Sequence, residues 1–128
     1  MLLLMLCSCQ YYNKLPNQDK AVDLIWRSYY GQTVYPPAIE WRTDRCGDRM
    51  DKYAAVYQNM CYGGLFLFWE DHILVAQSND GKIWNSALPH ELMHAKQWND
   101  NKVLDYEHTS PEWTLVGVVN NDLKERNW

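Results

Sequence analysis

Residues 63–76, GGLFLFWEDHILVA, predict the strands on which the rest of the fold is built. Two apolar runs lie in this segment, residues 65–69 and residues 73–76, and the polar pair at 70–71 separates them. Short apolar runs joined by a polar turn are typical of a β-hairpin. We therefore expect a hairpin over residues 65–76, opened by a pair of glycines.

Upstream of this hairpin the pattern predicts a helix and a further extended segment. Asn17 can cap a helix over about residues 18–30, which has apolar side chains on one face, and Gly31 ends it. The proline pair at 36–37 then breaks the chain before a partly alternating stretch, residues 38–42.

Two helices are predicted downstream. Residues 85–86 (NS) offer an N-cap for a helix with Pro89 in its first turn, and the polar run 99–101 (NDN) ends it. Residues 110–112 (SPE) combine an N-cap, a proline and an acid, which predicts a last helix reaching about residue 125. We expect an α+β domain: a short antiparallel or mixed sheet packed on the helix that follows residue 86, with N- and C-terminal helices.

Length and charge limit the classes of protein that fit. The chain has 128 residues, 47% of them hydrophobic, which suits one domain, expected over residues 18–128. The net charge of −4 argues against a nucleic-acid partner, since phosphate binding requires a concentrated basic surface.

The N-terminal residues are expected to be a targeting segment. Residues 1–7 are almost wholly apolar but too short to span a bilayer. The ending Leu6-Cys7-Ser8-Cys9 resembles a bacterial lipoprotein signal, which implies a removed segment 1–8, a lipid on Cys9, a tether over 9–17 and a place in the cell envelope. No Lys or Arg precedes the apolar run, so a cleaved ordinary signal and a buried terminal segment remain alternatives.

Two cysteines remain if Cys7 leaves with the signal and Cys9 carries lipid. Cys46 and Cys61 then suit one disulfide in an oxidising compartment. The alternative is a pair of unrelated buried thiols, because free cysteine packs as a small hydrophobic residue.

The chemistry of the chain is concentrated in residues 90–94, HELMH. His90 and His94 lie about one turn apart on one helical face, so both imidazoles can bind a single zinc ion. Glu91 is rotated about 100° from His90 and flanks the ion without ligating it. There it can accept a proton from a metal-bound water that attacks a carbonyl carbon.

This motif makes the chain similar to the zincin metallopeptidases. The hairpin leading through a turn into the motif helix resembles the zincin arrangement of sheet and active-site helix. Residues 108–113 (HTSPEW) also resemble the compact SprT-like zincins, in which a third histidine precedes an aromatic-bearing helix. The glycine that commonly follows that histidine is Thr109 here, the aromatic is one residue late, and the longer metzincin motif is absent.

A catalytic zinc needs a third side chain, and two candidates follow His94. His108 is expected to be this ligand, and Glu112 is the alternative because a downstream glutamate completes the site in thermolysin-like zincins. Glu112 already has a structural use near a helix N-terminus, whereas His108 has none.

Two functions are compatible with these residues. The resemblance implies a zinc metallopeptidase that hydrolyses peptide or protein substrates with Glu91 as general base. The alternative is a non-catalytic zinc-binding envelope module, whose site would be closed by a fourth protein ligand, with His72 or Glu107 as candidates. Tyr106 is a weaker candidate for hydrogen-bonding the oxyanion. Contact with a membrane is expected only through a lipid on Cys9.

Overall fold

The computed structural model describes residues 14–42, 63–78 and 80–128. The elements are α2 (Gln18–Asp23), the π-helix η1 (Leu24–Tyr29), β1 (Ala38–Arg42), β2 (Gly64–Leu67), β3 (His72–Ala76), α3 (Leu88–Asn101) and α4 (Trp113–Glu125). The predicted α+β class is thereby confirmed. The expectations for residues 1–8, for Cys9 and for the Cys46–Cys61 pair lie outside the described residues. No helix in the described part of the chain is long and apolar enough to cross a bilayer.

The sheet is mixed and has the strand order β1-β3-β2. β2 and β3 form the predicted antiparallel hairpin, with Leu65 opposite Leu74. β1 lies parallel to β3 on the other side, with Trp41 opposite Val75. β3 is therefore the central strand, and β2 is an edge strand among the described residues.

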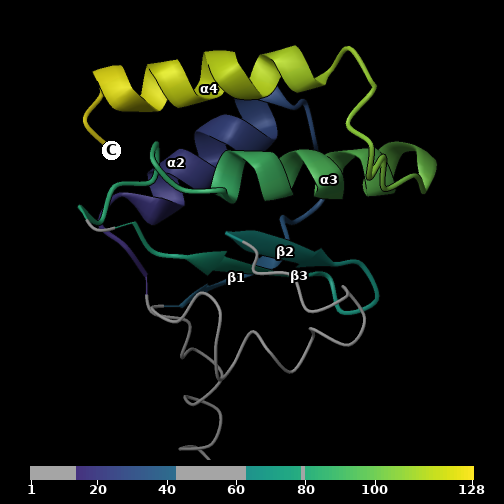
Figure 1. Cartoon of the computed structure of the whole chain (residues 1–128), viewed down its shortest axis with the longest axis horizontal. Coiled ribbons are helices and arrows are strands. Elements are labelled where there is room, and N and C mark those ends of the chain that lie inside the picture. The colour runs from purple at the N-terminus through teal and green to yellow at the C-terminus, as the bar shows by residue number, and fades with distance from the viewer. Residues whose placement is uncertain (1–13, 43–62, 79) are drawn as a thin grey trace, which may run out of the picture.

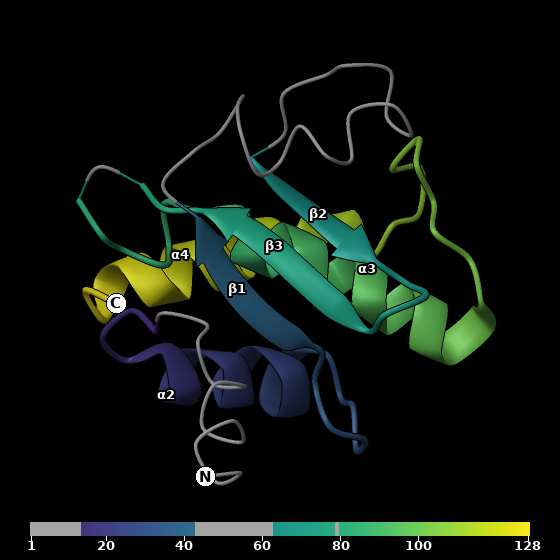
Figure 2. The same cartoon turned by 90° about the horizontal axis from the view of Figure 1, so that it is seen from below.

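The helices cover one face of the sheet (Figures 1 and 2). α3 contacts both β2 and β3, whereas α4 lies farther from the sheet and contacts α3 and η1. The apolar side chains between these layers form the main core, which includes Ile25, Trp26, Ile73, Leu92 and Leu123. Burial of each such side chain contributes about 1.5–3 kcal/mol. α3, which carries the H-E-x-x-H motif, is thus held on two sides.

The buried phenol of Tyr30 also anchors the start of α3. Its hydroxyl donates a hydrogen bond to the carbonyl oxygen of Pro89 at 2.8 Å, one residue before His90. Burial raises the pKa of Tyr30 above its ordinary value, which keeps the phenol protonated and donating. The bond fixes the first turn of α3 against η1.

The helix ends differ in detail from the expectations. Residues 24–29 form a π-helix instead of continuing the α-helix, and the Tyr30 N–H donates to Ile25. Asn17 is the N-cap residue of α2, as predicted, but it has φ 66° and its side chain makes no cap hydrogen bond. Ser86 does accept the N–H of Leu88, although Ala87 occupies the cap position. α4 begins at Trp113, after a turn in which the Ser110 hydroxyl accepts the N–H of Glu112.

Candidate metal centre

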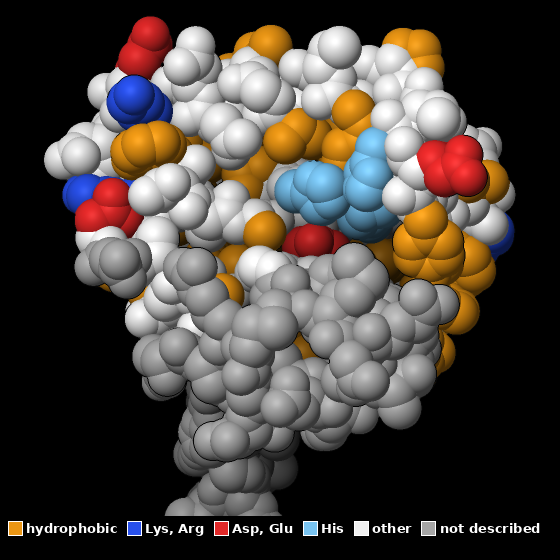
Figure 3. All heavy atoms as spheres, in the orientation of Figure 1, with side chains coloured by type: hydrophobic (Ala, Val, Ile, Leu, Met, Phe, Trp, Pro, Cys, Tyr) orange, Lys and Arg blue, Asp and Glu red, His pale blue; other side chains and the backbone are white. Residues whose placement is uncertain are grey.

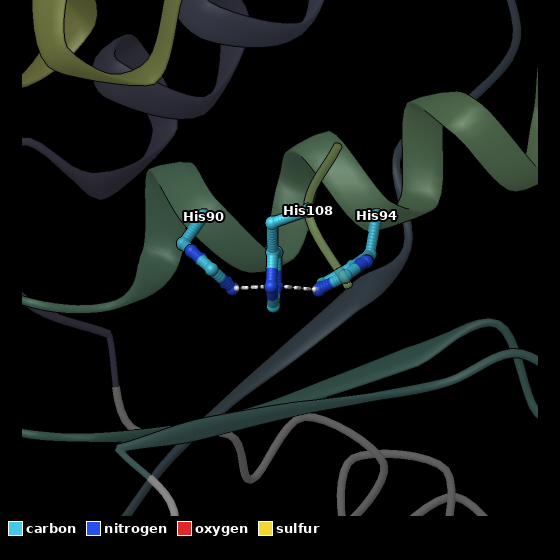
Figure 4. A group of neighbouring side chains, drawn as sticks. All are labelled: His90, His94 and His108. Carbon is cyan, nitrogen blue, oxygen red and sulfur yellow. Dashed lines mark hydrogen bonds between the residues drawn. The ribbon is translucent and has the colours of Figure 1, made fainter. Parts of the chain in front are cut away.

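Three histidine side chains converge beside α3. His90 and His94 extend from successive turns of that helix, and His108 reaches between them from the loop that follows it (Figure 4). The Nε2 atom of His108 lies 3.2 Å from the Nε2 atoms of both His90 and His94. One ligand atom from each residue falls within 4.8 Å of the other two, which is compact enough for a single ion.

The three rings form a continuous patch on one face of the molecule (Figure 3). They differ in exposure: His94 is buried, His90 is half-buried and His108 is exposed. A small cavity of about 100 Å³ adjoins them, and Glu91, Tyr106 and residues 64–66 of β2 also line it. Among the described residues, the cluster therefore reaches the surface through His108.

A backbone carbonyl orients His94. The Nδ1 atom of this ring lies 2.6 Å from the carbonyl oxygen of Leu104. A carbonyl only accepts, so Nδ1 carries the proton and Nε2 keeps its lone pair directed at the cluster. Metal-binding histidines in proteins are commonly oriented by such a bond on the other ring nitrogen.

The surroundings favour the neutral form of the His90 and His94 rings. Burial, together with the neighbouring His94 and His108, lowers the pKa of His90 to about 4. Burial also lowers the pKa of His94, against a raising effect of its bond to Leu104. Neutral imidazole is the form that binds a metal, so the cluster suits a cation at neutral pH.

Glu91 lies beside the histidines and is nearly inaccessible, with 6% of its surface exposed. Burial raises the pKa of its carboxyl group to about 8. A divalent cation in the cluster would favour the ionised carboxylate and oppose that shift. A carboxyl group with a raised pKa beside a candidate cation site can act as a general base.

Gly64 determines how closely β2 approaches this carboxyl group. A Cβ atom at Gly64 would lie 2.8 Å from Cγ of Glu91 and 3.1 Å from its Oε2. The first contact is closer than real Cβ atoms tolerate and the second is tighter than most, so a side chain here would displace Glu91. The sequence pattern predicts only that this glycine opens the hairpin.

Trp113 forms one wall of the cluster. Its ring centroid lies 4.7 Å from those of His90 and His94 and 4.6 Å from that of His108. The aromatic at the start of the last helix therefore contacts all three candidate ligands. Its position in the sequence, shortly after His108, is the signal that could have placed it here.

The other candidates from the sequence lie elsewhere. The Glu112 carboxylate accepts hydrogen bonds from Lys96 and, at 3.4 Å, from Gln97. His72 lies in the sheet, 3.2 Å from Glu40, and Glu107 is exposed. Among the described residues, the group that could hold an ion contains only His90, His94 and His108.

Comparisons with known protein families, with curated proteins and with solved structures find no match to this chain. The fold and the site together define a small α+β domain with an H-E-x-x-H helix and a cluster of three histidines.

Proposed function

We propose that the protein is a zinc-dependent hydrolase of peptide or related amide bonds, with a zincin-like arrangement of sheet and active-site helix. The observation that carries the proposal is the convergence of three histidine nitrogens beside the buried carboxyl group of Glu91. Neutral imidazole nitrogens are ligands that zinc prefers, and three of them leave a coordination position for water or substrate.

The donor set fits this metal. His90, His94 and His108 would hold the ion through Nε2, and the bond from His94 to Leu104 directs one of these nitrogens inward. Bound zinc supplies Lewis acidity, which polarises a carbonyl group and makes water more acidic. Structural zinc sites are closed by four protein ligands. In the part of the chain that the structure describes, no fourth donor joins the cluster, which favours hydrolysis over the alternative of a structural zinc module.

Glu91 is the proposed general base. Its carboxylate would take a proton from the attacking water and then deliver it to the leaving amine. The low exposure of this side chain limits competing solvent, and Gly64 allows it to lie against β2. The exposed Tyr106 lines the same cavity, where its phenol could approach a substrate oxygen.

We further propose that the protein acts in the cell envelope, anchored by lipid on Cys9. Only the Leu6-Cys7-Ser8-Cys9 sequence supports this location. Incorporation of labelled fatty acid, with Cys9→Ser as the unlabelled control, tests it.

The function is tested by comparing wild type with Glu91→Gln. The amide keeps the shape of the side chain but cannot accept the proton, so we expect full zinc content and a loss of hydrolysis of at least about a hundredfold. Zinc is measured in purified protein, and hydrolysis is followed by mass spectrometry of an unbiased peptide mixture. If Glu91→Gln hydrolysed peptides within a few-fold of the wild-type rate, Glu91 would not be the general base. A zinc-loaded wild type that cleaves no amide would favour the binding module.

A further inference from the structure

The loop between α3 and α4 is closed by one carboxylate, that of Asp105. Its Oδ1 accepts the backbone N–H of Thr109 at 3.1 Å and the hydroxyl of the same residue at 3.2 Å. Its Oδ2 accepts the backbone N–H of Ser110 at 3.1 Å and the indole N–H of Trp113 at 2.6 Å. These bonds lower the pKa of Asp105, with the indole bond contributing most, so the carboxylate is ionised across the physiological range.

We call the four hydrogen bonds accepted by the Asp105 carboxylate the Asp105 clamp. The loop needs this clamp because its backbone conformation is unfavourable. Asp105 has φ 45° and His108 has φ 56°, both in the left-handed region that side chains other than glycine rarely adopt. The N–H of His108 donates to the carbonyl oxygen of Asp105 at 2.9 Å, so a tight turn carries the candidate ligand. Conformations of this kind persist only where the surroundings hold them.

Trp113 connects this clamp to the histidines. The indole N–H is fixed on Asp105, while the ring lies 4.6–4.7 Å from all three imidazole centroids. An indole held at one edge limits the angles at which the neighbouring rings can pack. The residue before Asp105 contributes too, because Leu104 provides the carbonyl that orients His94.

We propose that Asp105 and Trp113 are the positioning residues of the metal centre. Asp105 holds the turn that presents His108 and, through Leu104, the carbonyl that orients His94. Trp113 transmits this constraint to the imidazole rings. Neither side chain is a metal ligand, and neither contacts the reacting atoms. The proposal rests on the metal site of the proposed function and deepens it, because it names the residues that preorganise the three ligands.

Two conservative variants test the pair. Asp105→Asn keeps the shape but replaces one acceptor oxygen by an amide that faces donors, and Trp113→Phe keeps an aromatic ring without the indole N–H. Asp80→Asn is the matched control, because Asp80 closes another surface loop by accepting the Ser78 hydroxyl and the Lys82 N–H. Zinc affinity is measured by competition with a chromophoric chelator, and geometry by the visible absorption spectrum of the cobalt-substituted protein.

We expect Asp105→Asn to weaken zinc binding about 10–100-fold and to alter the cobalt spectrum, as loss of a partner beyond the ligands commonly does. Trp113→Phe should also weaken zinc binding and alter the cobalt spectrum. Asp80→Asn should leave the zinc affinity and the spectrum unchanged. A merely structural role would lower the free energy of unfolding of metal-free protein and leave affinity and spectrum unchanged. The proposal would be overturned if Asp105→Asn and Trp113→Phe bound zinc within twofold of wild type and had the cobalt spectrum of wild type.

A metal-free measurement separates this proposal from the proposed function. Amide hydrogen exchange at Thr109 and Ser110 should be slow in wild type and faster in Asp105→Asn, without any ion present. If exchange at these amides is the same in Asp105→Asn as in wild type, Asp105 does not hold the loop, even if wild type binds zinc and cleaves peptides. If exchange is faster in Asp105→Asn but wild type binds no zinc, Asp105 holds the turn at His108 and the metal site itself is overturned.

Discussion

The carboxylate of Glu112 is engaged by the ammonium group of Lys96, across the interface between the start of α4 and α3. Lys96 also donates to Asp100 at 2.8 Å, so the lysine joins two acids at the outer side of the helix. This arrangement gives Glu112 a structural role of its own. It also makes the two candidate third ligands experimentally separable.

We predict opposite consequences for the two alanine variants. His108→Ala removes a nitrogen from the cluster and should weaken zinc binding at least about tenfold. Glu112→Ala should leave zinc affinity within about twofold and lower the free energy of unfolding by roughly 0.5–1 kcal/mol, because it breaks a partly exposed ion pair. Chelator competition and urea unfolding measure the two effects. The reverse order of zinc affinities would transfer the ligand role to Glu112.

A second prediction concerns the contact between Gly64 and Glu91. Gly64→Ala places a methyl group 2.8 Å from Cγ of Glu91, which must move. A displacement of about 1 Å at a catalytic group can cost roughly a hundredfold in rate, so we expect a loss of that order with zinc affinity retained. Peptide hydrolysis and zinc titration of the same preparation measure both quantities.

Gly63→Ala is the neighbouring control for that experiment. Among the described residues, a Cβ atom at Gly63 would meet only Ala87 at 3.8 Å, an ordinary van der Waals contact. Its hydrolysis rate should stay close to that of wild type. Equal rates in the two variants would show that the approach of β2 does not position Glu91.

Local patterns predicted the hairpin and the motif helix well. The two apolar runs on either side of residues 70–71 predict β2 and β3, because short apolar runs joined by a polar turn are typical of a hairpin. The start of α3 could be located from Ser86 and Pro89, which act within one turn of the chain. Both features depend on neighbours in sequence.

Features that depend on distant residues could not be predicted in this way. The π-helix η1 places Trp26 and Tyr30 where they donate to the carbonyls of Val34 and Pro89, and no local periodicity encodes those partners. The closeness of Gly64 to Glu91 arises from packing of β2 on α3. The position of His108 depends on the left-handed backbone at Asp105 and at His108 itself, which the sequence around them does not single out.

A third prediction follows from mass action. A ligand that binds only the folded state stabilises it by about 2.7 kcal/mol when its free concentration is a hundred times its dissociation constant. Zinc should therefore raise the melting temperature of the metal-free protein by roughly 10 °C at that concentration. His94→Ala should abolish the increase, since His94 is a cluster member oriented by Leu104.

His72→Gln is the control in that series, because His72 lies beside Glu40 in the sheet and outside the cluster. Its response to zinc should match that of wild type, whatever its melting temperature without metal. A full zinc response in His94→Ala would place the ion elsewhere.

The last prediction concerns the hydrogen bond between Tyr29 of η1 and Asp122 of α4. This bond is the main reason why the pKa of Asp122 is lowered, and Arg126 contributes as the second partner. The unfolded state therefore binds the proton more readily than the folded state, so this contribution to stability is present at neutral pH and is lost as the pH falls. Conversely, the bond raises the pKa of Tyr29, so part of the stability should also be lost above about pH 10.

Tyr29→Phe should accordingly lower the free energy of unfolding at pH 7 and make its decline on acidification shallower. The difference between variant and wild type should shrink as the pH falls and Asp122 becomes protonated in both. Urea unfolding in the presence of a chelator, at several pH values, measures this without interference from metal binding. Tyr35→Phe is the control, because the Tyr35 side chain is 87% exposed and its variant should follow wild type at every pH. A constant difference between Tyr29→Phe and wild type from pH 2.5 to pH 7 would show that the ionisation of Asp122 does not depend on this bond.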